Sequence, residues 1–351
     1  MGMENAITSR NDGKVHWQRG VLLLAAVLVG YLVNLGCGQV QKPVTLAGAE
    51  ARPTNIQRHQ GAWYWLEKTA KAGTHLVRTE ASGRKVLVTA EALSTYSWEE
   101  GKLIWLAREG KQWTISLAGA DGSNPHPLWS GEEEPIGLNL SGGKLTWLHR
   151  LPAVAENLPF PPLNSTLEVL TLSLEGGKPN SIAHLSESED GVVLGFQGDS
   201  LYVATYRHDP PGSFCLYRIP AGGVPVRIAG EIGIAPAILT KDGGLYWLAK
   251  SQEVARPGGA CVRHLDKAGH PETLSDWLPD SGQLYETTHG VVLGDREGDA
   301  AVWAIGKQDE FPKPFPRPVG YYGWGAGEGE MLLIRPTTSP VVIDIAEVSL
   351  P

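Results

Sequence analysis

The chain has 351 residues, 42 % of them apolar, with 43 glycines, 25 prolines and a formal net charge of −8. The negative charge argues against nucleic-acid binding, which needs a basic surface to neutralise phosphates. The apolar fraction is ample for a core, and the many glycines and prolines are typical of short strands joined by tight turns.

The first 37 residues have the layout of an export signal. Residues 1–20 carry three basic side chains, residues 21–35 are apolar apart from Asn34, and small residues follow. This order is typical of secretory signals. We predict a cytoplasmic cationic segment over 1–20, a hydrophobic signal or membrane-anchor helix over 21–37, and a linker over 38–43. The remaining residues, 44–351, would then lie outside the cytoplasm, in the periplasm or at the cell surface.

Cys37 leaves three outcomes open. Gly36-Cys37 resembles the end of a bacterial lipoprotein signal, whose cysteine is lipidated after cleavage, although Asn34 stands where such signals normally have leucine. The segment therefore predicts a lipid anchor on Cys37, a retained N-terminal helix, or cleavage to a free protein.

A glycine turn followed by a short apolar strand recurs along the rest of the chain. The clearest copies are Gly244-Leu245-Tyr246-Trp247-Leu248, Gly101 to Leu106 and Gly143 to Leu148. Seven copies place an apolar marker residue at positions 65, 105, 147, 203, 247, 293 and 333, which are 40 to 56 residues apart. Strand-like repeats of this length predict propeller blades, so we expect one all-β domain, a seven-bladed β-propeller over 44–351. The repeated tryptophans are expected to pack between blades.

The two ends of the repeat array indicate how the ring closes. In the fifth blade we expect an inner strand over Ala235–Thr240, a third strand over Cys261–Leu265 and a fourth over Glu272–Leu274. Pro43 to Gly48 resembles the fourth-strand segment Pro225 to Gly230 but lacks a blade of its own. Since Val341–Val348 reads as a third strand with nothing after it, the N-terminal strand is expected to complete the last blade and protect its edge.

Several of these segments resemble a known group of proteins. The runs Phe214 to Ala229 and Gly243 to Trp247 look like the repeats of bacterial exported propellers of the TolB-like and YWTD-like groups, and Ile115 to Pro125 is similar to the TolB-type repeat. The resemblance implies the β-propeller fold. Such proteins include periplasmic scaffolds, receptor ectodomains, sugar-active enzymes and sensor parts of signalling proteins, so it implies no single function.

Sequence-readable catalytic signatures are absent. The chain has no Gly-x-Ser-x-Gly, His-Glu-x-x-His, Walker or Cys-x-x-Cys motif and no EF-hand loop, so we expect no cofactor and no metal site. Cys215 and Cys261 occupy equivalent third strands of neighbouring blades. Because packed sheets lie about 10 Å apart, we expect two unpaired, buried thiols.

Each predicted blade carries a cation where its second strand ends. In a closed ring these positions share the face of the second-to-third strand loops, so they predict a ring of positive charge that holds an anionic ligand. The alternative is that these cations are solvated or paired with neighbouring acidic residues. The members of this ring are Lys68, Arg108, Arg150, Arg207, Lys250, Arg296 and Arg335.

The same face is expected to carry the longest loops, 151–164, 207–211 and 252–259, and binding residues usually sit on such loops. Two acidic runs, Glu132 to Glu134 and Glu187 to Asp190, fall in connections between blades and are expected on this face as solvated charge. The candidate ligand-binding cluster is His149, Arg150, Arg207, His208 and Asp209.

These observations favour an extracytoplasmic, membrane-tethered binding or scaffolding module that uses the loop face of blades three to five. Its partners would be a protein or an anionic glycan, and the membrane through the N-terminal anchor or lipid, but not nucleic acid. One alternative is a lyase or hydrolase acting on an anionic polysaccharide or a peptide at the channel mouth. Another is the sensor ectodomain of a signalling system.

Overall fold

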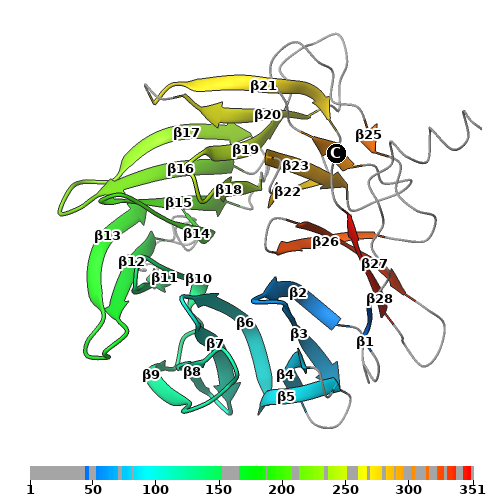
Figure 1. Cartoon of the computed structure of the whole chain (residues 1–351). Coiled ribbons are helices and arrows are strands. Elements are labelled where there is room, and N and C mark those ends of the chain that lie inside the picture. The colour runs from blue at the N-terminus through cyan, green and yellow to red at the C-terminus, as the bar shows by residue number, and fades with distance from the viewer. Residues whose placement is uncertain are drawn as a thin grey trace, which may run out of the picture.

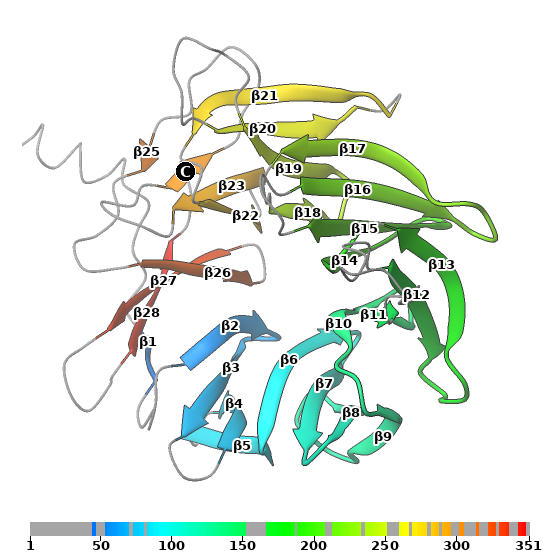
Figure 2. The same ribbon diagram turned by 180° about the vertical axis from the view of Figure 1, so that it is seen from behind.

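The computed structural model describes residues 44–46, 53–69, 73–80, 83–151, 166–186, 188–207, 213–232, 236–250, 260–266, 269–278, 282–287, 290–295, 302–304, 314–315, 322–327, 330–336 and 343–348. In these ranges the elements are strands, and they form seven four-stranded antiparallel sheets arranged as blades around a common axis (Figures 1 and 2). The all-β repeat predicted from the sequence is therefore present.

The predicted cytoplasmic segment, anchor, Cys37 and linker lie outside the described residues. Among the residues that are described, no helix has the length and apolar character needed to cross a membrane.

The first four blades follow one another in chain order. Blade one contains β2 (Pro53–His59), β3 (Ala62–Thr69), β4 (Gly73–Glu80) and β5 (Gly83–Ala90). Blade two contains β6 (Ala92–Glu99), β7 (Lys102–Glu109), β8 (Gln112–Gly119) and β9 (His126–Gly131). Blade three contains β10 (Ile136–Ser141), β11 (Lys144–Leu151), β12 (Thr166–Ser173) and β13 (Asn180–Ser186). Blade four contains β14 (Asp190–Gln197), β15 (Ser200–Arg207), β16 (Ser213–Pro220) and β17 (Val226–Ile232).

The last three blades complete the circle. Blade five contains β18 (Ala237–Leu239), β19 (Leu245–Lys250), β20 (Ala260–Leu265) and β21 (Pro271–Leu278), so its fourth strand is longer and its inner strand shorter than predicted. Blade six contains β22 (Gly282–Thr287), β23 (Gly290–Asp295), β24 (Val302–Ala304) and β25 (Pro314–Phe315). Blade seven contains β26 (Tyr322–Gly327), β27 (Glu330–Pro336), β28 (Ile343–Val348) and β1 (Val44–Leu46).

Blade seven joins the two ends of the array, as the sequence predicted. β1 pairs antiparallel with β28, so that Val44 lies opposite Ile345 and Leu46 opposite Ile343. The N-terminal strand thus covers the edge of the last blade, next to blade one in the ring (Figure 1).

The marker tryptophans form the core between blades. The side chains of Trp65, Trp147 and Trp247 are almost completely buried. Trp147 of β11 packs in one cluster with Ile104 and Leu106 of the preceding blade. The predicted role of these tryptophans in blade packing is confirmed.

Several inner strands carry a β-bulge near the axis, among them β6 and β10. The pairing register shifts between Leu93 and Thr95 in β6 and between Ile136 and Asn139 in β10. Gly137, inside the second bulge, has a φ of +61°, and a Cβ there would lie 2.8 Å from the carbonyl oxygen of Gly191 at the start of β14. Glycine therefore lets the inner strands of blades three and four approach closely.

The two described cysteines are unpaired, as predicted. Cys261 is buried, whereas Cys215 is half-buried and so more exposed than expected.

Candidate functional site

The cations predicted to form a ring lie at the ends of the second strands. Lys68, Arg108, Arg150 and Arg335 are the next-to-last residues of β3, β7, β11 and β27, and Arg207 and Lys250 end β15 and β19. Arg296, His208 and Asp209 lie outside the described residues, and of Lys250 and Arg335 the structure describes only the strand position. The side chain of Lys68 is exposed. These positions at the strand ends agree with the prediction.

Arg108 is engaged by its own blade and by the connection before it. Its guanidinium lies 3.1 Å from a carboxylate oxygen of Glu91, between β5 and β6, and 5.6 Å from the ring centre of Trp113. The other oxygen of Glu91 accepts a hydrogen bond from the backbone N–H of Gly110 at 2.9 Å. Arg108 and Glu91 therefore connect the segment that leads into blade two with the end of β7.

Arg150 is held by the connection that follows blade three. Its Nε and Nη2 both donate to the backbone oxygen of Glu189, at 3.0 Å and 2.6 Å. Because successive side chains of a strand point to opposite faces, Arg150 and its neighbour His149 reach different sides of blade three. Arg150 contacts the connection that follows blade three, and His149 contacts the connection that precedes it.

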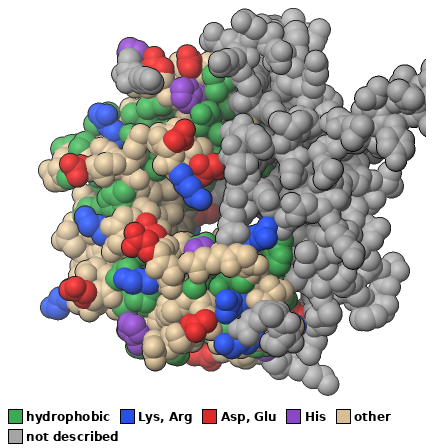
Figure 3. Space-filling model, in the orientation of Figure 1, with side chains coloured by type: hydrophobic (Ala, Val, Ile, Leu, Met, Phe, Trp, Pro, Cys, Tyr) green, Lys and Arg blue, Asp and Glu red, His purple; other side chains and the backbone are tan. Residues whose placement is uncertain are grey.

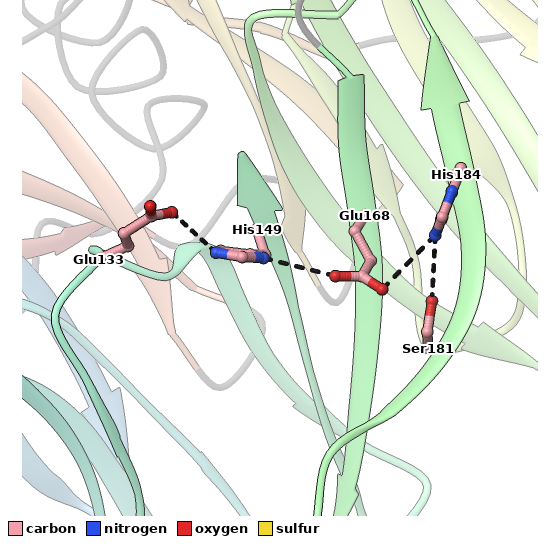
Figure 4. A network of polar contacts seen from close by, with 5 residues as sticks. All are labelled: Glu133, His149, Glu168, Ser181 and His184. Carbon is pink, nitrogen blue, oxygen red and sulfur yellow. Dashed lines mark hydrogen bonds and ion pairs between the residues drawn. The ribbon is translucent and has the colours of Figure 1, made fainter. Parts of the chain in front are cut away.

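His149 belongs to a row of polar side chains that crosses blade three (Figure 4). His149 of β11 lies opposite Glu168 of β12, which lies opposite His184 of β13. Nδ1 of His149 is 3.4 Å from one oxygen of Glu168, and Nε2 of His184 is 3.5 Å from the other. The other ring nitrogen of His149, Nε2, is 2.7 Å from the carboxylate of Glu133, in the β9–β10 connection.

These contacts lower the pKa of Glu168 from its usual value. The largest cause is a hydrogen bond from Ser181, and hydrogen bonds from His149 and His184 add to it against the opposing effect of partial burial. Glu168 is therefore held as a carboxylate. Both ring nitrogens of His149 face carboxylates, those of Glu133 and Glu168.

A hollow of about 890 Å³ opens beside this row, where the inner strands of blades two, three and four begin. Its wall includes the bulge of β6, the bulge of β10 and the start of β14, and its rim is charged. The wall residues are Ser94, Thr95, Ile136, Gly137, Leu138 and Val192. The rim residues are Glu133, Glu134, Arg150 and Asp190.

The hollow brings together segments that the sequence assigned to one face. Part of each predicted acidic run, the end of β11 and the connections between blades all contribute to its lining. Its centre is blade three, flanked by blades two and four, whereas the sequence pointed to blades three to five. Acidic and basic side chains both lie near the central opening of the molecule (Figure 3).

Asp190 links this rim to a half-buried tyrosine, Tyr206. It lies opposite Tyr206 of β15, and burial, with the charge of Asp190 as a smaller cause, raises the pKa of Tyr206 to about 12. Tyr206 therefore stays neutral over the physiological range.

Glu133, Glu168, Ser181 and His184 were not singled out as site residues from the sequence. The signal for two of them is the strand register, because Glu168 and His184 share one cross-strand row with His149. The described residues contain no group of three or more His, Cys, Asp or Glu side chains arranged to hold a metal ion.

No protein-family model matches the sequence, and no curated protein matches it. Solved structures do match. The acylaminoacyl peptidase of Pyrococcus horikoshii is 13 % identical, with a TM-score of 0.60 over 86 % of this chain, and this chain spans about half of its length (52 %). An oligogalacturonate lyase in complex with manganese is 10 % identical, with a TM-score of 0.60 over 90 % of this chain and 98 % of its own.

The β-propeller domain of the Trilobed protease from Pyrococcus furiosus is also similar, with 10 % identity and a TM-score of 0.57 over 85 % of this chain and 95 % of its own. TolB from Acinetobacter baumannii is among the matches with a TM-score of 0.43. The seven four-stranded sheets and the matches with TM-scores of 0.57 to 0.60 identify the structure as a β-propeller. At these identities the likeness concerns the fold and not the activity.

Proposed function

We propose that this protein is an extracytoplasmic, membrane-tethered binding or scaffolding module that uses the loop face of its propeller. The observation that carries the proposal is the hollow of about 890 Å³ at the ends of three blades. Charged side chains on a rigid strand framework are a common form of binding site, because the framework limits the entropy lost on binding. The partner is a protein or an anionic glycan that contacts this face.

The test is site-specific photocrosslinking in membranes that contain the full chain. One crosslinking residue replaces Glu134 at the rim, and a matched one replaces Lys178, an exposed residue in the β12–β13 turn at the other end of the blade. A binding face predicts adducts from position 134 that are absent from position 178. The same adducts from both positions, or none from position 134, would contradict the proposal.

The tether rests on residues 21–37 and is tested separately. Cys37→Ser releases the chain from membranes if a lipid on Cys37 holds it, and leaves it there if a retained helix does. A chain that appears in the soluble fraction with and without the substitution would rule out both forms of tether.

A second candidate is a lyase or hydrolase that acts on an anionic polysaccharide or a peptide at the channel mouth. The observation that favours it is the pair of carboxylates on His149, at 2.7 Å and 3.4 Å, one of which belongs to the hollow. The similar structures include an oligogalacturonate lyase and peptidases. Against it, both ring nitrogens of His149 are already engaged.

An activity assay separates this candidate from the binding module. The protein is incubated with oligogalacturonate and with peptides, and new double bonds and new amino groups are measured. Turnover that is lost in His149→Ala and kept in His184→Ala would establish the enzyme. Product formation no faster than with heat-denatured protein would exclude these substrates and leave the binding module.

A further inference from the structure

We infer that the hollow binds a cationic group, the ammonium or guanidinium of a lysine or arginine side chain on a partner protein. This inference rests on the proposed function, because it names the chemistry of the ligand at the same face. It differs from the expectation of an anionic ligand, which came from the positions of the cations along the sequence.

The charges of the lining are the first reason. Its rim holds three carboxylates, those of Glu133, Glu134 and Asp190, and one guanidinium, that of Arg150. Two nitrogens of Arg150 are committed to the backbone oxygen of Glu189, at 3.0 Å and 2.6 Å. A concave surface with an excess of carboxylates concentrates a negative potential, which attracts a cation and repels an anion.

The availability of Glu134 is the second reason. Glu133 shares its carboxylate with His149 at 2.7 Å, and Asp190 accepts a hydrogen bond from the N–H of Gly191 at 2.8 Å. Glu134 is exposed and lines the hollow, and within the described ranges no hydrogen bond or ion pair engages it. A carboxylate in this position can accept a charge-assisted hydrogen bond from an incoming ammonium group without first losing a partner in the fold.

The shape of the wall is the third reason. The lining also includes Ile136, Leu138 and Val192, which offer apolar surface, and Ser94 and Thr95, which contribute hydroxyl groups at the bulge of β6. Lysine and arginine combine an apolar stem with a charged end, so one side chain can place its stem against the apolar residues and its charge among the carboxylates. An anionic sugar lacks such a stem.

The test is calorimetric titration of the full chain in detergent micelles with a hexalysine peptide and with a hexaglutamate peptide. Hexalysine is expected to bind, and Glu134→Gln combined with Asp190→Asn is expected to weaken it at least about tenfold, since each charge-assisted hydrogen bond contributes roughly 1.5 to 3 kcal/mol. Glu134→Gln alone is also measured, and its matched control is Glu132→Gln, which removes one charge from the same connection at an exposed residue outside the lining.

Each other outcome counts against the inference. Weakening by Glu132→Gln equal to that by Glu134→Gln alone would show general surface attraction. Hexaglutamate binding that is lost in Arg150→Gln would overturn the cationic ligand and leave the binding function intact. No binding of either peptide would overturn the cationic ligand, and the photocrosslink from position 134 then decides whether the face binds a partner at all. Unchanged urea midpoints of the variants exclude misfolding as the cause of any loss.

Discussion

The first part of β11 and its last residues use the same strand for different purposes. Leu145, Trp147 and Leu148 are at most 1 % exposed and pack between blades, whereas the side chain of His149 is 30 % exposed and meets carboxylates from another strand and a connection. Arg150 holds the connection to the next blade. The packed residues determine whether the blades assemble, and the strand ends determine what the assembled ring presents.

The largest expected effect tests this division inside one strand. Trp147→Ala should lower the free energy of unfolding by about 3 to 5 kcal/mol, because it leaves a cavity between blades two and three. His149→Ala, two residues later on the same face, should cost less than about 1 kcal/mol. Urea denaturation of both variants measures the difference. Similar losses of unfolding free energy would show that the two parts of β11 do not differ in their contribution to stability.

A second pair of variants tests where the inner strands meet. Gly137 and Gly142 both have left-handed φ values, +61° and +60°, but an added Cβ meets the backbone of blade four only at Gly137. Gly142→Ala should therefore cost about 1 kcal/mol, for the backbone conformation alone. Gly137→Ala should cost about 2 to 4 kcal/mol, because overpacking is added to that strain. Thermal unfolding of both variants measures the difference. Equal decreases in melting temperature would show that the inner strands of blades three and four do not approach closely at Gly137.

Tyr206 extends the comparison to high pH. Its folded pKa is raised to about 12 from 10.0, so it contributes stability that is fully present below about pH 10 and is lost as the pH rises to about 12. The loss should be about 2 to 3 kcal/mol. The free energy of unfolding, measured across this interval, should fall less steeply in Tyr206→Phe. Parallel curves for the two proteins would show that the pKa of Tyr206 is not raised in the folded protein.

The smallest effect concerns Glu168 at acid pH. Its pKa is lowered in the folded protein, so its stabilisation is present above the unfolded value of 4.5 and is lost as the pH falls through the folded value. Glu168→Gln should cost less than about 1 kcal/mol at neutral pH, because solvent screens this row, and nothing at low pH. Glu175→Gln, at an exposed turn, is the control. If the loss of unfolding free energy in Glu168→Gln does not change with pH, the charge of Glu168 does not stabilise the fold.

The blade structure could be predicted from the sequence because it depends on local patterns. A glycine turn and an alternating strand recur every forty residues or so, and the alternation identifies Trp65, Trp147 and Trp247 as core. The similarity between Pro43 to Gly48 and Pro225 to Gly230 was enough to predict the pairing of β1 with β28.

The polar row and the hollow could not be predicted in the same way. The long insertion between β11 and β12 hides the register that places Glu168 opposite His149. Glu133 reaches His149 from a connection, and no strand pattern predicts that contact. The bulges of β6 and β10 shape the wall of the hollow, but each is a shift of register that side-chain type alone does not reveal.

By itself the sequence determined the repeat, the buried tryptophans, the closing strand and the positions of the cations, because each follows from spacing along one segment of chain. The tertiary structure decided which charges meet. It committed Arg108 and Arg150 to neighbouring connections and gathered Glu133, Glu134 and Asp190 around one hollow. Such contacts join residues from different blades, so they depend on how the sheets pack and not on the order of residues within any one of them.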